Sequence, residues 1–96
     1  DNPLMSTLHV VSHSPFTDSR LDSCLRICGS DDAILLCGDG AYGLHHPALQ
    51  LKGVKVFVLA EDSLARNLPL PDWADCVDYP GFVQLSIDYD KVNTWL

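Results

Sequence analysis

The chain has 96 residues and a net charge of −7, the balance of 13 acidic and 6 basic side chains. An acidic surface repels phosphate backbones, which argues against direct contact with nucleic acid, and no apolar run reaches the roughly 18 residues that span a membrane. The length and the apolar content of 47% predict one folded domain, residues 5–96. Met5 is interpreted as the native start, and residues 1–4 as a remnant that precedes it.

Short apolar runs alternate with helix-like segments, which is the pattern of βαβ units and a parallel sheet. Residues 7–11 predict the first strand. A helix is predicted at about residues 19–28, because its apolar side chains recur on one face of a 3.6-residue period. Gly29 is expected to end this helix in the left-handed conformation. The apolar run 33–37 predicts a strand that is covered on both faces.

The middle of the chain carries signals of unequal strength. Residues 41–44 indicate a second helix only weakly, since Pro47 shortens it. Residues 54–59 are β-branched and aromatic and predict the clearest strand. A short helix is expected over residues 61–67, with Asn67 as its left-handed final residue.

The end of the chain predicts a fourth strand, a capped helix and a further segment. Residues 76–77 form the strand, and Asp78 caps a helix that runs to about Tyr89. Residues 91–96 either add a strand or pack Trp95 against the body of the domain. The helices are few for so apolar a sheet, which predicts uncovered patches and an oligomer interface.

Several stretches, in order along the chain, resemble the TusB/DsrH family within the wider DsrE-like fold. They read LHVVSHSPF at residues 8–16, LDSCL at 21–25, LLCGDGAY at 35–42, VFVL at 56–59 with LAR at 64–66, and VDY at 77–79 with FV at 82–83. Their order and spacing over so short a chain carry the resemblance. It implies a small Rossmann-like α/β domain, with a mainly parallel sheet and helices on both faces.

The resemblance further implies an accessory subunit of a TusBCD-type sulfur-relay complex. TusC-like and TusD-like subunits would complete a heterohexamer, which takes persulfide sulfur from a TusA-type donor and passes it towards a TusE-type acceptor. The end product is 2-thiolated wobble uridine in tRNA, and the working relay cysteine would lie on the TusD-like subunit. The alternative is a DsrH-type subunit of a dissimilatory sulfur-oxidation complex, with Cys24 as a direct persulfide carrier. No cofactor is implied.

Cys24 is the candidate catalytic residue of the chain. A persulfide carrier needs an accessible thiolate, and Arg20, one turn earlier on the same predicted helix face, could supply a cation that lowers the thiol pKa. The DsrH-type pattern carries a cysteine at the matching position. However, Cys24 lies on the apolar stripe, where a free cysteine usually packs as a small hydrophobic residue. The chain is therefore expected to be a non-catalytic subunit of a sulfurtransferase complex.

Other side chains are weaker candidates for a functional site. Cys28, one helical turn after Cys24, is expected to pack in the core. Cys37 ends the second strand at the sheet edge where ligands of open α/β sheets bind, so a free-standing module with a small ligand at residues 37–40 is a third hypothesis. Asp39 is expected to cap the helix that follows.

The cysteines and histidines show no metal-binding spacing. Four cysteines are present, none in a CxxC pair and none behind a secretory signal, so we expect reduced thiols in the cytoplasm. His45 and His46 are near Cys37 in the sequence but lack the paired spacing of zinc sites, and we expect exposed loop positions and no metal. His9 and His13 are given no role.

Overall fold

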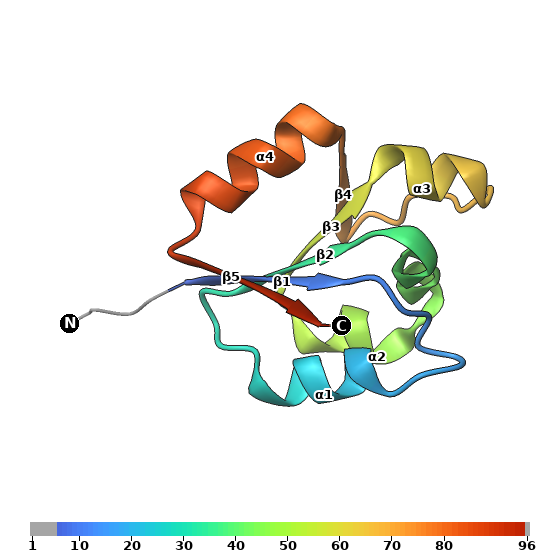
Figure 1. Ribbon diagram of the computed structural model, residues 1–96. Coiled ribbons are helices and arrows are strands. Elements are labelled where there is room, and N and C mark those ends of the chain that lie inside the picture. Colours follow the sequence, from blue (N-terminus) through green and yellow to red (C-terminus); the bar gives the residue numbers. More distant parts are fainter. Residues whose placement is uncertain (1–5, 96) are drawn as a thin grey trace.

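The chain folds as an open sheet with helices on both of its faces, as the computed structural model in Figure 1 shows; residues 6–95 are described. The predicted native start at Met5, the residues before it and the final Leu96 lie outside the described residues. No helix within the described part of the chain is long and apolar enough to cross a membrane.

The strands of the sheet are β1 (Thr7–Val11), β2 (Ala33–Leu36), β3 (Lys55–Leu59), β4 (Ala74–Val77) and β5 (Lys91–Trp95). Their order in the sheet is β4-β3-β2-β1-β5, and all neighbouring strands run parallel. The run at residues 33–37, which was predicted to be covered on both faces, forms the inner strand β2 between β1 and β3. That prediction is confirmed, because all residues of β2 are buried and helices cover both faces of a parallel sheet.

The helices between the strands are α1 (Arg20–Ile27), the 3₁₀ helix η1 (Gly38–His45), α2 (Pro47–Lys52), α3 (Ala60–Ala65) and α4 (Tyr79–Asp88). Figure 1 shows α1 and α2 on one face of the sheet and α4 on the other. Parallel strands need such crossover connections, because a tight hairpin can join only antiparallel strands. The predicted α/β fold with helices on both faces is confirmed.

Each face of the sheet has its own core, because successive side chains of a strand point to opposite faces. The face under α1 and α2 buries Val11, Leu21, Cys24, Leu25, Cys28, Ile34, Leu36, Ala41, Leu44, Leu49, Val56, Val58 and Ala74. The face under α4 buries Leu8, Val10, Ala33, Leu35 and Phe57.

Of the predictions for three helix termini, two are confirmed and one is wrong. Asn67 has a φ of 54°, left-handed as predicted, and the Asp78 carboxylate accepts a backbone N–H in the first turn of α4 at 2.8 Å. Gly29, however, is not left-handed, because α1 ends at Cys28 in an extended conformation. The Gly29 N–H instead donates to the Asp32 carboxylate at 2.8 Å, so a side chain takes the place of the predicted turn.

Residues 38–52 form two helices where a single short one was predicted. In η1, Gly40 passes so close to β1 that a Cβ there would lie 2.1 Å from the Val11 carbonyl oxygen. Pro47 begins α2 instead of shortening a helix, because the N–H that proline lacks has no partner in a first turn anyway. Gly53 ends α2 with a φ of 75°. The sequence prediction was wrong here because it treated Pro47 as a breaker.

Candidate functional site

Helix α1 places two thiols on its buried face, one turn apart. Cys24 is 0% exposed and Cys28 is 9% exposed, and both belong to the core under α1 and α2. Their Sγ atoms are 3.9 Å apart, which is a thiol–thiol contact between free cysteines. Both side chains lie where the packing interpretation placed them, on the apolar stripe that faces the sheet.

The hydrogen bond between the two thiols gives them different acidities. The pKa of Cys24 is raised above the ordinary thiol value, first because its S–H is held in the hydrogen bond to Cys28 and then because burial disfavours a thiolate. The pKa of Cys28 is lowered by the same hydrogen bond, against the opposing effect of burial. The two thiols share one hydrogen bond, in which either sulfur atom can be the donor.

The cation that the sequence suggested for Cys24 has another partner. The guanidinium of Arg20 is ion-paired with the carboxylate of Asp18, just before α1. The same carboxylate accepts the backbone N–H of Arg20 at 2.8 Å, so Asp18 also stabilises the start of the helix. Cys24 lies one turn further on and is fully buried, and the groups that shift its pKa, Cys28 and Asp32, both raise it.

His9 adjoins the thiols from the middle of β1. It is buried, its Nε2 lies 3.2 Å from the Asp32 carboxylate, and the indole Nε1–H of Trp95 donates to its Nδ1 at 3.1 Å. Because Nδ1 accepts a hydrogen bond from Trp95, the proton of the neutral ring is on Nε2 and is donated to Asp32. Within the described residues 91–95, both alternatives occur, because this segment adds the strand β5 and also packs Trp95 on the core.

Asp32 joins three segments of the chain just before β2. Its carboxylate accepts the backbone N–H of Thr7 at 2.9 Å and that of Gly29 at 2.8 Å, in addition to the ring of His9. Burial on its own raises the pKa of Asp32, but these hydrogen bonds outweigh burial and lower the pKa below its ordinary value. Asp32 is therefore a carboxylate at neutral pH and holds the end of α1 against β1.

Three side chains of this cluster could hold a metal ion. His9, Cys24 and Cys28 offer one nitrogen and two sulfur atoms that lie within 4.8 Å of one another. Imidazole and thiolate are the ligands of zinc and copper sites. Both ring nitrogens of His9 already have protein partners, so an ion could bind the ring only if Trp95 or Asp32 moved away.

The carboxyl edge of the sheet carries Cys37, separate from the thiol pair. Cys37 is half-buried, and its pKa is raised by burial and then by the negative charge of Asp62. The capping role predicted for Asp39 is wrong, because its carboxylate accepts hydrogen bonds from Arg66 at 2.9 and 3.2 Å. Asp62 instead accepts the backbone N–H of Gly38 at 2.8 Å, next to Cys37. These carboxylates make the edge unfavourable for a thiolate.

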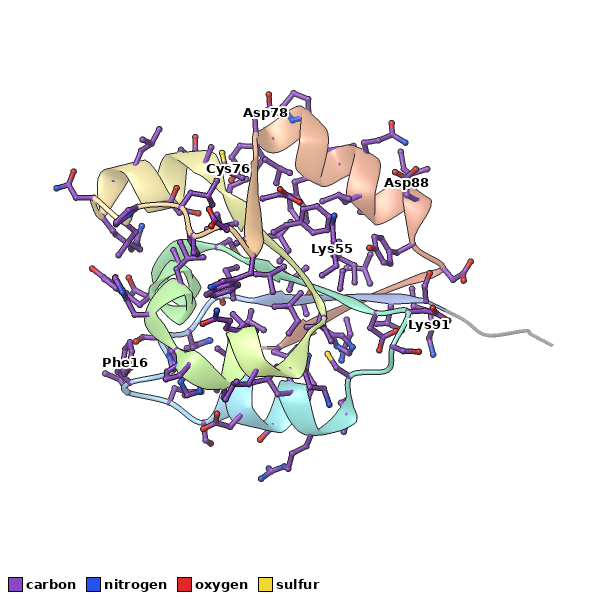
Figure 2. All side chains as sticks on the ribbon, turned by 180° about the vertical axis from the view of Figure 1, so that it is seen from behind. Phe16, Lys55, Cys76, Asp78, Asp88 and Lys91 are labelled. Carbon is purple, nitrogen blue, oxygen red and sulfur yellow. The ribbon has the colours of Figure 1, made fainter. Side chains whose placement is uncertain are left out.

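The loop histidines do not gather around Cys37. His46 is half-buried, with its Nε2 2.9 Å from the Asp22 carboxylate, whereas His45 is exposed as expected. Within residues 6–95, neither shares a ligand cluster with Cys37. The fourth thiol, Cys76, is exposed on the edge strand β4, near the start of α4 (Figure 2).

No role was expected for His9 or Asp32, yet both adjoin the thiol pair. A signal was available for His9, because it interrupts an apolar inner strand and a buried ring needs hydrogen-bond partners. Asp32 gave no comparable signal. An acidic residue before a strand is typical of a loop, and its partners come from three different segments.

Comparisons with known proteins agree with this fold. A family described as "DsrH like protein" matches residues 13–92. The crystal structure of the ychN protein from E. coli superposes with a TM-score of 0.75 at 18% identity, covering 95% of this chain and 99% of that one. The solution structure of protein Tm0979 from Thermotoga maritima has a TM-score of 0.64 at 22% identity, covering 85% and 92%. Both structures show the fold alone. No curated protein matches the sequence.

Proposed function

The chain belongs to the DsrH-like family, and on this premise we propose that it works as a subunit of a sulfur-relay complex. The complex is of the TusBCD type, in which TusC-like and TusD-like subunits complete a heterohexamer. It receives persulfide sulfur from a TusA-type donor, hands it to a TusE-type acceptor and supplies the 2-thiolation of wobble uridine in tRNA. The family match over residues 13–92 is the observation that carries the proposal.

The position of Cys24 supports an accessory role in this complex. A relay thiol must meet the thiol of the next protein, and therefore has to be accessible and readily ionised. Cys24 is fully buried, and its pKa is raised by its hydrogen bond to Cys28 and by burial. The obligatory relay cysteine is accordingly assigned to the TusD-like subunit, and the alternative of Cys24 as a direct carrier is less well supported.

The outer side of α4 supports the expectation of partner subunits. Tyr79, Val83 and Ile87 recur one turn apart and are exposed by 55%, 55% and 69%. They form an apolar stripe on a helix whose inner side already packs on the sheet, and such a stripe on a small protein is typical of a protein–protein interface. The net charge of −7 agrees with a tRNA contact that is made by another subunit.

Deletion and complementation test the proposal. A strain that lacks this chain should lose 2-thiouridine, measured by mass spectrometry of digested tRNA, and the wild-type chain should restore it. Cys24→Ala should also restore near-normal 2-thiouridine, because it removes the thiol without adding a polar group. If Cys24→Ala assembled normally but 2-thiouridine disappeared, Cys24 would be a relay thiol. If deletion left 2-thiouridine intact, the role in tRNA thiolation would be refuted and sulfur oxidation would become the candidate.

Assembly is tested on the apolar stripe of α4. The double substitution of Val83→Lys and Ile87→Lys should prevent co-purification with the TusC-like and TusD-like subunits, because two charges would be buried at the interface. Gln50→Lys provides the matched control, since Gln50 is exposed on α2, on the opposite face of the sheet. Co-purification of the double variant at wild-type yield would show that the stripe is not the interface.

A further inference from the structure

A pocket of about 300 Å³ opens where the C-terminal ends of α1 and α2 meet. It is lined by Cys28, Gly29, Ser30, Lys52, Gly53 and Val54. A neighbouring pocket of about 500 Å³ shares Ser30, Gly53 and Val54 with it, so the two form one groove. The groove lies on the face of the sheet that holds the thiol pair, and is far larger than a water molecule needs.

Cys28 is the member of the thiol pair that meets this pocket. It follows the last residue of α1 and is 9% exposed, whereas Cys24, one turn deeper, is 0% exposed. Their Sγ atoms are 3.9 Å apart, so the S–H of Cys24 can donate to a thiolate on Cys28. The thiol that borders the pocket is thus hydrogen-bonded to a thiol deeper in the core.

Lys52 brings a positive charge to the same pocket. It is the last residue of α2, and the turn at Gly53, with its φ of 75°, directs the chain from α2 into β3. A nearby ammonium group favours a thiolate and attracts anions. Four groups therefore surround Cys28: Cys24 on its own helix, Lys52 on α2, and His9 and Asp32 from the sheet side.

The acidity of Cys28 agrees with this arrangement. Its pKa is lowered mainly by the hydrogen bond from Cys24 and to a smaller extent by Lys52, while burial and the charge of Asp32 act in the opposite direction. Neither Cys24 nor Cys37, whose pKa values are both raised, has a comparable environment.

We propose that Cys28 is a sulfur-accepting thiol, which takes sulfane sulfur from a small anionic persulfide bound in the pocket beside Lys52. The inference rests on the proposed sulfur-relay function and deepens it, because it adds an acceptor on this chain to the relay thiol of the partner subunit. Cys24 acts as a positioning residue, which stabilises the Cys28 thiolate through its S–H.

The transfer needs no oxidant or reductant. The Cys28 thiolate attacks the outer sulfur of a persulfide R–S–SH, a bond forms between Cys28 Sγ and that sulfur, and the S–S bond of the donor breaks. The thiolate R–S⁻ leaves with the electron pair, and the transferred sulfur keeps its proton, which gives Cys28–S–SH. The ammonium group of Lys52 lies beside the pocket in which R–S⁻ is released.

Treatment of the full chain with glutathione persulfide, followed by mass mapping of the cysteine-containing peptides, tests the inference. Cys28 should gain the mass of one sulfur atom, while Cys24 should gain none. The exposed Cys76 reports in every sample that the reagent was active. Sulfur on Cys24, or an unmodified Cys28 beside a modified Cys76, would overturn the proposal.

Two variants separate the proposed roles from mere packing. Lys52→Met should slow modification of Cys28 about 3- to 10-fold at neutral pH, because loss of a nearby cation raises the thiol pKa and leaves less thiolate, and Lys52→Arg should recover most of the rate. Cys24→Ala should move the pH profile of Cys28 modification to higher pH, since the thiolate loses its hydrogen-bond donor. Unchanged rates and profiles in both variants would refute the assignment of Lys52 and Cys24.

The inference and the proposed function fail in different experiments. Modification of Cys28 is measured on the isolated chain, whereas the relay role is measured by complex assembly and by 2-thiouridine in cells. An unmodified Cys28 in a strain with normal complementation would remove this inference alone. A modified Cys28 in a protein that does not support thiolation would remove the relay role alone.

Discussion

The two faces of the sheet differ in how completely the chain covers them. Under α1 and α2 the core is covered except at the groove beside the helix ends, and Leu49 on α2 is only 1% exposed. Helix α4 covers the opposite face with no fully buried residue of its own, and its Leu85 is only partly buried. Figure 2 shows α4 between Asp78 and Asp88 at the outside of the molecule. The comparison shows that the helices of the chain bury their side chains more completely on one face than on the other.

The faces also differ in the chemistry that they hold. The closed face contains the thiol pair with His9 and Asp32, which are polar groups that stay buried because each has a partner. The open face presents apolar side chains of α4 at its surface. Under the proposed function, the face of α1 and α2 keeps the thiol pair, and the face of α4 is the one proposed to bind neighbouring subunits.

The largest effect is expected from truncating matched leucines on the two faces. Leu49→Ala should lower the free energy of unfolding by about 2–5 kcal/mol, because it leaves a cavity in a closed core. Leu85→Ala should cost clearly less, about 1–2 kcal/mol, because the side chain is already partly exposed and water can fill the gap. Urea unfolding of the full chain at low concentration measures both, and equal losses would show that the faces are equally closed.

Asp32→Asn should destabilise the closed face by about 1.5–3 kcal/mol at neutral pH, because the carboxylate accepts several hydrogen bonds there. The pKa of Asp32 is lower in the folded chain than in the unfolded chain. Its contribution is therefore present above the unfolded value of about 3.9 and is lost as the pH falls through the folded value. Unfolding curves of both proteins should converge in acid; a constant difference at all pH values would contradict this prediction.

Cys24→Ser should cost about 1–3 kcal/mol, because it places a hydroxyl on an apolar helix face without a full set of partners. A bond from the hydroxyl to the carbonyl four residues earlier would reduce the cost. Cys24→Ala should cost less than Cys24→Ser, and thermal unfolding distinguishes the two. The reverse order would mean that the cavity, and not the polarity, dominates at this position.

Substitutions on the exposed side of α4 are expected to have the smallest effect on stability and a large effect on association. Val83→Lys combined with Ile87→Lys should change the free energy of unfolding by less than about 0.5 kcal/mol, because both side chains are exposed. The wild-type chain should self-associate in sedimentation experiments without its partners, and the double variant should do so less. A wild-type chain that stays monomeric at high concentration would show that the apolar side of α4 does not drive association.

The sheet could be predicted from sequence because its inner strands are short and mostly apolar runs, as strands buried on both faces are. The cap at Asp78 and the left-handed Asn67 were equally local features, and both are observed. The errors at Gly29 and Pro47 have a common origin. Each residue was interpreted from its own preference, while a contact with Asp32 or a position at a helix start decided its conformation.

The candidate site was only partly predictable, for the same physical reason. Cys24 was identified from its helix and the family pattern, and its burial follows from the apolar stripe of α1. Cys28 was expected only to pack, because its sequence neighbours show neither the pocket nor the amine of Lys52. Cys28 and Lys52 follow or end two different helices, so their proximity cannot be read from the sequence around either residue.

The sequence by itself determined the family through its resemblance, and it determined the parallel sheet and the helix that carries the thiols through patterns within short segments. Only the tertiary structure decided which groups surround those thiols. His9 and Trp95 are hydrogen-bonded across 86 positions of the chain, and Asp32 joins β1 to the end of α1. The acidity of a buried thiol depends on such neighbours, because in a region of low dielectric the nearest charges and hydrogen bonds outweigh the intrinsic pKa of the group.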